Sequence, residues 1–471
     1  MLKMTGLTCL SLATAFAALS SEDLKRSLES FQSMETHPAT VLNPETETSE
    51  EGFIASLAPS RLIEETLTPP PLRNFENEPV TFDREGILSD RDARISELFH
   101  VPLDLRDRVG FWFDIYTKHD SNRRIIHHAV YPWIVFKVID VSFIINSDQP
   151  SRRWMRNEKA DKYVKAETEA IRVALRQLSK KGRAPQTDLE KQVAQALLPL
   201  GGTLSAQARR ASKEVRVQTG QKEHFTEGLR ISQRYMGPME QILESHRLPT
   251  ELSRIPFVES SFNKQATSKV GASGIWQFMG NTGRKFMRVD DLIDERRSPL
   301  KATEGAARLL KENHMILHRS WPLAITAWNH GPPGVRRAIR ATGSKDLPVI
   351  VSKYRSKSFD FASSNFYSEF LAALHAEKYS AEIFGSLIRE DEISVSIIKV
   401  PRRTQMARII EISGLSMEEF LRINPDLSSS LRKRGVIPAG FRLHIPSDSK
   451  EAVEKLLVLR PAIARAGNLE N

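Results

Sequence analysis

The stretch PFVESSFNKQATSKVGASGIWQFMG, residues 256–280, decides the fold of the central part of this chain and its chemistry. One acidic residue, Glu259, stands beside Phe257 and Val258, and the next carboxylate along the chain is Asp290. Burial of a carboxyl group among apolar side chains disfavours the ionised form and raises its pKa. A carboxylic acid that stays protonated near neutral pH can donate a proton to a leaving group, so Glu259 is a candidate general acid.

The residues that follow Glu259 favour a ligand cleft over the more common alternative, a surface glutamate at a helix end. Gly274 permits a tight turn and a close approach of the backbone to a ligand. Ser268 and Gln277 supply uncharged hydrogen-bonding groups, and Trp276 supplies a flat apolar surface. Flat apolar surfaces combined with neutral donors and acceptors are typical of a sugar-binding cleft.

Residues 259–279 resemble the signature of the lytic transglycosylases of the soluble-transglycosylase (goose-lysozyme-like) superfamily. That signature runs Glu-Ser, an aromatic residue, Ala-x-Ser, then Gly-Ala-x-Gly-(Leu/Ile)-x-Gln, and each part is present here in order. The family motif Ala-Tyr-Asn-x-Gly corresponds to AWNHG at 327–331, with Trp328 in place of the tyrosine. The family motif Glu-Thr-x-x-Tyr-Val corresponds to SSNFYS at 363–368, where Ser363 replaces the glutamate and Tyr367 is kept.

This resemblance implies cleavage of the β-1,4 bond between N-acetylmuramic acid and N-acetylglucosamine in peptidoglycan, with formation of a 1,6-anhydro ring. Ordinary glycosidases use two carboxyl groups. In the family the substrate's N-acetyl group stabilises the cation at C1 and its C6 hydroxyl replaces water, so that one acid suffices, here Glu259 in both proton transfers. The implied substrate-binding residues are Ser268, Gly274, Trp276, Gln277, Trp328, Asn329 and Tyr367.

Two other functions stay open at this point. Hydrolysis, as in goose-type lysozymes, would normally call for a second acid, and Asp290, Asp291 and Asp294 are better explained as parts of a turn. A peptidoglycan-binding or scaffold protein with a weakened site would suit the departures at Trp328 and Ser363. An indole N–H can donate a hydrogen bond but cannot accept one, unlike the motif phenol.

Composition and the positions of proline, glycine and other turn residues along the chain predict six segments. Residues 1–20 read as a secretory signal peptide, with a first amphipathic helix as the alternative, and residues 21–100 as a flexible arm. Residues 101–150, rich in aromatic and β-branched residues, predict a small strand-rich unit that includes 109–117. Residues 151–238 predict helices, which Gly237-Pro238 would break or kink. Residues 239–388 form the expected catalytic domain.

The last folded segment, residues 392–447, predicts a β-α-α-β module, with a helix stop at Gly414 and a helix cap at Ser416. It resembles a peptidoglycan-binding LysM module through Asn424-Pro425 and the run from Ile437 to Pro446. The expected fold class is therefore mainly α: a lysozyme-like transglycosylase domain with a strand-rich N-terminal unit and a C-terminal LysM-like module.

The charge balance is basic, with a formal net charge of +10 and a sequence pI near 9.5, and it suits an anionic wall polymer. We expect peptidoglycan glycan strands as the partner, no nucleic acid, no cofactor and a monomer. We expect no metal because His127 and His128, adjacent on a strand, would point to opposite faces. The one cysteine, Cys9, lies in the predicted signal peptide; its lipidation and membrane association stay open, and the expected location is the periplasm or cell envelope, including the outer membrane.

Overall fold

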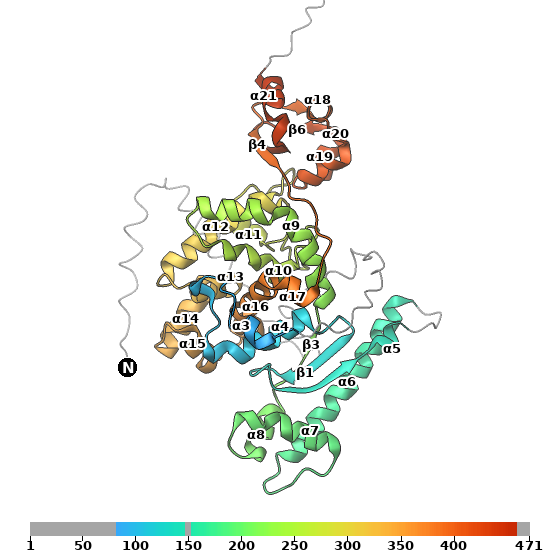
Figure 1. The fold of residues 1–471 in the computed structure, drawn as a ribbon, viewed down its shortest axis with the longest axis vertical. Helices are drawn as coiled ribbons and strands as arrows, with labels where there is room; N and C mark the ends of the chain where they lie inside the picture. Colours follow the sequence, from blue (N-terminus) through green and yellow to red (C-terminus); the bar gives the residue numbers. More distant parts are fainter. Residues whose placement is uncertain (1–81, 147–151, 459–471) are drawn as a thin grey trace, which may run out of the picture. The chain divides into compact units, whose positions relative to one another are not determined.

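The computed structural model describes residues 82–146 and 152–458 (Figure 1). The predicted signal peptide, Cys9 and residues 21–81 of the predicted arm lie outside the described residues. The rest of that arm, 82–100, is ordered here, with helix α3 (Arg84–Leu88) and buried Ile87, Leu88 and Phe99. The described chain is mainly helical, in agreement with the expected class. Within it, no helix is both long and apolar enough to cross a membrane.

Residues 109–117, which we predicted as strand, belong instead to helix α4 (Arg106–Thr117). The aromatic run VGFWF reads equally well as a buried strand or a buried helix, because an uninterrupted apolar segment carries no period that separates them. In α4 nearly every side is covered: Val109, Phe113 and Ile115 are fully buried, and the helix packs against α16 (Phe361–Lys378) and α9 (Lys222–Ser245). The short helix α3 (Arg84–Leu88) precedes it.

A three-stranded antiparallel sheet follows, in the order β2-β1-β3, made of β1 (Arg123–His128), β2 (Val135–Asp140) and β3 (Val215–Thr219). The third strand comes from the segment that we expected to be entirely helical. Between β2 and β3 the chain forms four helices that share a separate apolar core with the sheet. These are α5 (Ser142–Ile145), α6 (Arg153–Leu178), α7 (Asp188–Leu197) and α8 (Leu204–Ala211).

Helix α9 continues through Gly237 and Pro238, so of the predicted break or kink the break does not occur. A proline inside a helix leaves the carbonyl four residues earlier without its N–H donor. Here that carbonyl, of Arg234, accepts a hydrogen bond of 2.9 Å from the backbone N–H of Ile393, in the segment that follows the catalytic region. A contact from a distant segment therefore compensates the lost helical hydrogen bond.

The catalytic region is a bundle of helices whose core is continuous with α3, α4 and α9. Helix α13 packs on both α12 and α16, α12 packs on α9, and α10 packs on α16. The bundle thus incorporates the N-terminal helices in one core. Its helices are α10 (Ile255–Ser260), α11 (Gly280–Gly283), α12 (Pro299–Ile316), α13 (Trp321–His330), α14 (Pro332–Thr342), α15 (Leu347–Lys353), α16 and α17 (Ser380–Phe384).

The C-terminal segment pairs β4 (Val395–Lys399) with β7 (Arg442–Pro446) in an antiparallel ladder. The helix stop at Gly414, with φ of 66°, and the capping box of Ser416 with Glu419 are confirmed. The segment that we expected to be a loop before the last strand contains a further helix. The remaining elements are β5 (Thr404–Gln405), α18 (Met406–Ser413), α19 (Met417–Ile423), α20 (Ser429–Arg434), β6 (Val436–Ile437) and α21 (Lys450–Val458).

Candidate active site

Glu259 lies near the end of the short helix α10, one residue before the chain leaves the helix through a left-handed turn at Ser261, with φ of 49°. The side chain is partly exposed, whereas Phe257 is fully buried and Val258 nearly so. The Glu259 Oε1 atom accepts a hydrogen bond of 2.8 Å from Trp328 Nε1. Burial raises the pKa of Glu259 to about 8, against the smaller opposing effect of the Trp328 hydrogen bond. The carboxyl is thus protonated at neutral pH, as a general acid requires.

Trp328 forms the link between Glu259 and the core. Its ring packs against Trp276 and Phe278, with centroid distances of 5.4 Å and 5.1 Å. Trp276 itself is fully buried, and its Nε1 donates to Thr303 Oγ1 at 2.9 Å. Our expectation that Trp276 presents its face to a sugar is therefore wrong: this side chain supports Trp328 from behind.

Small and polar residues within 256–280 fix the conformation of the loop that follows α10. Gly274 has φ of +75°, and a Cβ atom there would lie 1.9 Å from the carbonyl oxygen of Arg296, so only glycine fits. Gln277 Nε2 donates to the carbonyls of Gly274 and Ala266, at 2.7 Å and 3.2 Å. Ser268 Oγ accepts from the Ala272 N–H at 2.9 Å, which closes the turn. Ser268 and Gln277 shape the loop, and their contact with a sugar stays a prediction.

Ser363, which occupies the place of the motif glutamate, joins α16 to the end of α13. Its hydroxyl donates to Asn329 Oδ1 at 2.9 Å and lies 3.1 Å from His330 Nδ1. Asn329 is exposed, while Tyr367, one turn further along α16, is only 3% exposed and stacks on Phe370. Asn329 is therefore accessible to a ligand, whereas Tyr367, which we expected to bind substrate, lies largely inside the protein.

A second carboxyl that the sequence reasoning missed, Glu369 on α16, lies within the electrostatic influence of Glu259. Burial, together with the smaller effect of the negative charge of Glu259, raises the pKa of Glu369 to about 8. The nearby phenol of Tyr116 on α4 is affected by both carboxylates, which together with burial raise its pKa well above the usual value. A sequence signal for this proximity is absent, because α4 and α16 are far apart along the chain.

The acidic residues that we attributed to a turn do have that role. Asp290 Oδ1 accepts hydrogen bonds from the N–H groups of Leu292 and Ile293, both at 2.9 Å. Asp294 pairs with Arg296 at 2.8 Å. Neither is a second carboxylate for Glu259. His127 and His128 are buried, and burial lowers their pKa values to about 3 and about 4, so both are neutral. Among the described residues no group of three or more potential ligands could hold a metal ion.

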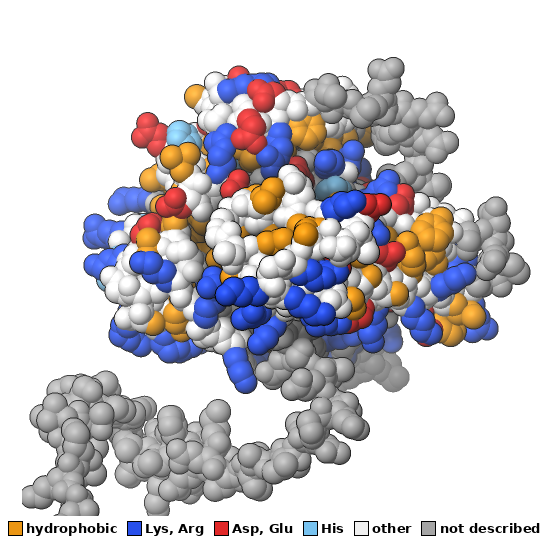
Figure 2. Space-filling view, turned by 90° about the horizontal axis from the view of Figure 1, so that it is seen from below, with side chains coloured by type: hydrophobic (Ala, Val, Ile, Leu, Met, Phe, Trp, Pro, Cys, Tyr) orange, Lys and Arg blue, Asp and Glu red, His pale blue; other side chains and the backbone are white. Residues whose placement is uncertain are grey.

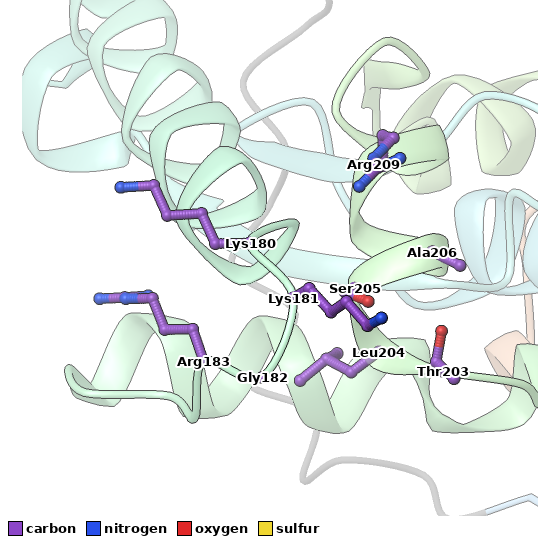
Figure 3. A pocket seen from close by; sticks show the side chains of 9 residues that line it. All are labelled: Lys180, Lys181, Gly182, Arg183, Thr203, Leu204, Ser205, Ala206 and Arg209. Atoms are coloured by element: carbon purple, nitrogen blue, oxygen red, sulfur yellow. The ribbon is translucent and has the colours of Figure 1, made fainter.

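A hollow of about 430 Å³ lies elsewhere, between the end of α6 and the start of α8 (Figure 3). It is lined by Lys180, Lys181, Arg183 and Arg209 and by no carboxylate, so it cannot perform acid catalysis. The segment 152–214 holds fifteen Lys and Arg residues against seven Asp and Glu, an excess of eight that accounts for most of the chain's net charge of +10. Figure 2 shows blue Lys and Arg side chains gathered on the face seen from below.

A comparison with known protein families identifies the domain that contains Glu259 and Trp328. Residues 239–349 match the family described as the Transglycosylase SLT domain. The SLT domain thus contains Glu259, the loop that follows it and Trp328, whereas Tyr116 and Glu369 lie outside the matched residues.

Individual relatives agree with this match. A membrane-bound lytic murein transglycosylase D of Escherichia coli (strain K12) is 26% identical over 197 residues, which cover 40% of this chain and 41% of the relative. A putative tributyltin chloride resistance protein of Alteromonas sp. (strain M-1) is 33% identical over 109 residues, covering 23% of this chain and 53% of that protein. The chain thus spans about half or less of the length of these curated relatives.

Among solved structures, the 70 kDa soluble lytic transglycosylase of Escherichia coli is 21% identical, covering 49% of this chain and 35% of that one. The TM-score is 0.28, and no conclusion rests on this likeness.

Proposed function

We propose that this protein is a peptidoglycan lytic transglycosylase, in which Glu259 is the single catalytic acid and base. The observation that carries the proposal is the state of Glu259: a carboxyl held neutral by burial, within an SLT domain, with an indole N–H as its hydrogen-bond donor. The match of the transglycosylase D relative supports the same class of reaction.

In the proposed reaction, protonated Glu259 gives its proton to the glycosidic oxygen as the bond from that oxygen to C1 of N-acetylmuramic acid breaks. The Trp328 N–H then stabilises the carboxylate that forms, because a hydrogen bond to the charged form favours it. The C6 hydroxyl of the same sugar bonds to C1 and passes its proton to the Glu259 carboxylate. The proton count closes without water, and Glu259 returns to its initial state.

Trp328 in place of the motif tyrosine is compatible with this cycle. An indole N–H is a donor only, so it strengthens its bond to Glu259 when the carboxyl ionises and cannot compete for the proton. Ser363 likewise keeps the end of α13 attached to α16 through Asn329. Ser268, Gly274, Gln277 and Asn329 are the residues that we propose to contact the sugar, with Trp276 reassigned to the support of Trp328.

The C-terminal segment fits a second role in the same function. Its β4–β7 ladder with the intervening helices agrees with the strand and helix order of a LysM-like module, and we propose that it binds glycan strands. The basic segment 152–214 would favour an anionic wall polymer over a neutral one. We propose a cell-envelope location on the basis of this substrate and of the membrane-bound relative.

The direct test is the release of soluble fragments from purified peptidoglycan sacculi by the full chain. We expect Glu259→Gln to lower the rate by at least about a hundredfold, since general acid catalysis alone contributes about 10²–10⁴-fold. The matched control is Glu377→Gln, a glutamate of α16 that pairs with Arg254 at 3.0 Å. Wild-type rates in the Glu259→Gln protein would remove the catalytic assignment, and the scaffold function would then be favoured.

A further inference from the structure

The hollow between α6 and α8 lies outside the matched SLT residues, and none of the preceding chemistry uses it (Figure 3). Its volume of about 430 Å³ falls within the range of about 300–1,000 Å³ that small-molecule sites occupy. One wall is the turn that follows α6, and the other is α8 with the residue before it. Two segments that are separate in the chain therefore contribute side chains to one concave surface.

Both walls of the hollow have a fixed backbone. Leu178 at the end of α6 and Ala208 of α8 are fully buried in the same apolar core. In the turn after α6 the backbone N–H of Arg183 donates to the carbonyl three residues earlier at 3.2 Å, and Gly182 takes a φ of +74°, which favours glycine. The Arg183 guanidinium is held by Glu190 at 3.0 Å. The hollow is thus formed without a ligand.

Three cations at the hollow have no partner within the protein. The side chains of Lys180, Lys181 and Arg209 make no ion pair or hydrogen bond with any residue that the structure describes. Another cation of α6 does have such a partner, since Arg176 lies 2.7 Å from Glu169. The lining of the hollow contains no carboxylate, so the three positive charges share it without a counter-charge. Such a concentration of one sign of charge in a concave surface favours an anion.

Two hydroxyl groups add neutral donors to the same lining. Thr203 stands at the N-cap position of α8, yet its hydroxyl makes no capping hydrogen bond. A threonine at this position usually bonds to a backbone N–H of the first turn, so the Thr203 hydroxyl is left free. The Ser205 hydroxyl likewise has no hydrogen bond to a described residue. Both hydroxyls can donate to the oxygens of an anion.

We propose that this hollow binds a phosphate monoester. Such a group carries a charge of about −1.5 to −2 at pH 7 and three acceptor oxygens, so it can accept from donors on both walls at once. A carboxylate has one charge and two oxygens in one plane, and it would leave part of this donor set unpaired. The headgroup of a lipid such as phosphatidic acid and a soluble ester such as glycerol 3-phosphate share the required chemistry. The site is independent of the proposed reaction at Glu259.

Calorimetry of the full chain with glycerol 3-phosphate tests the site with a soluble ester. The variant Lys181→Gln with Arg209→Gln removes one charge from each wall. The matched control, Lys159→Gln with Lys165→Gln, removes two exposed charges of α6, at least about 20 Å along the helix from Leu178. We expect the affinity to fall at least about tenfold in the hollow variant, the effect of one charge-assisted hydrogen bond, and to stay within about twofold in the control.

Sedimentation with vesicles of phosphatidylcholine containing phosphatidic acid tests the site with a lipid headgroup, with phosphatidylcholine vesicles as the background. Binding lost in the hollow variant but kept in the control identifies a lipid headgroup if it is seen with vesicles, and a soluble ester if it is seen with glycerol 3-phosphate alone. Thermal melting would show that each protein is folded.

Three results would overturn the phosphate site. Wild type would bind neither probe, or the hollow variant and the control would lose binding equally in both experiments. In the third, the hollow variant would bind peptidoglycan sacculi more weakly while its binding of both phosphate probes stayed unchanged, which would assign the hollow to the carboxylates of the wall polymer. Because none of these measurements requires turnover, the loss of this site would leave the proposed function untouched.

Discussion

Replacing Glu259 by Gln should make the protein more stable, and increasingly so as the pH rises. The carboxyl has a pKa of about 8 in the folded chain against 4.5 as its ordinary value. Between these two pH values the unfolded chain releases the proton while the folded chain keeps it. The unfolded state therefore binds fewer protons, and the stability of wild type falls as the pH rises through this window. Because Gln does not ionise, the unfolding free energy of the variant does not fall with pH through this group.

The size of this loss of unfolding free energy follows from the same two pKa values. Each unit of pKa difference corresponds to about 1.4 kcal/mol, so wild type loses about 3 kcal/mol of unfolding free energy through this group by pH 7. Above pH 8 the loss levels off near about 5 kcal/mol, because both states are then ionised. Below pH 4.5 the two proteins should differ only by the exchange of a hydroxyl for an amide.

Urea unfolding of both proteins at pH 5, 7 and 9, followed by circular dichroism, measures this directly. All other titrating groups are common to the two chains, so the difference in unfolding free energy isolates Glu259 and the groups coupled to it. We expect the variant's advantage to grow by about 4 kcal/mol from pH 5 to pH 9. A difference that stays constant within about 1 kcal/mol over that range would refute a raised pKa at Glu259.

Three further predictions concern the surroundings of the site. Trp328→Phe removes the donor that lowers the pKa of Glu259, so the alkaline limit of activity should move up by about one pH unit; an unchanged limit in the pH–rate profile would contradict this. Gly274→Ala should cost about 3 kcal/mol or more of unfolding free energy, measured in urea, because its backbone conformation and close neighbour exclude a Cβ. Lys301→Met would leave the buried carboxylate of Asp426, its partner at 2.6 Å, without a counter-charge. We expect this to cost about 3–5 kcal/mol of unfolding free energy. Lys301→Met combined with Asp426→Leu should recover most of that loss; equal melting of all three proteins would refute the role of the pair.

Motif spacing predicted the parts of the site that lie close together in the chain or share one motif. Glu259 lies near a helix end, Gly274 takes a positive φ in a turn and Trp328 bonds to Glu259, while their roles in catalysis and sugar binding stay predictions. Asp290 and Asp294 form the expected turn. These features depend on local geometry: a helix end, a left-handed glycine and a side chain that closes its own loop. The helix stop at Gly414 belongs to the same class.

The remaining features depend on contacts between distant segments, which periodicity does not report. The aromatic run at 109–117 forms a helix because α9 and α16 cover it on several sides. Pro238 is tolerated because Ile393 supplies the missing donor to the freed carbonyl. Trp276 is buried because Thr303 of α12 offers a partner for its indole. Glu369 comes within the electrostatic influence of Glu259 because α10 packs against α16.

The central claim is that Glu259 cleaves peptidoglycan with the substrate's own C6 hydroxyl as the nucleophile. Mass spectrometry of the soluble fragments from a sacculus digest, with the Glu259→Gln protein as the blank, tests it most directly. The account predicts muropeptides that are one water lighter than hydrolysis products and resist borohydride reduction, which marks anhydro ends. Fragments with reducing ends, or identical digests from wild type and Glu259→Gln, would contradict it.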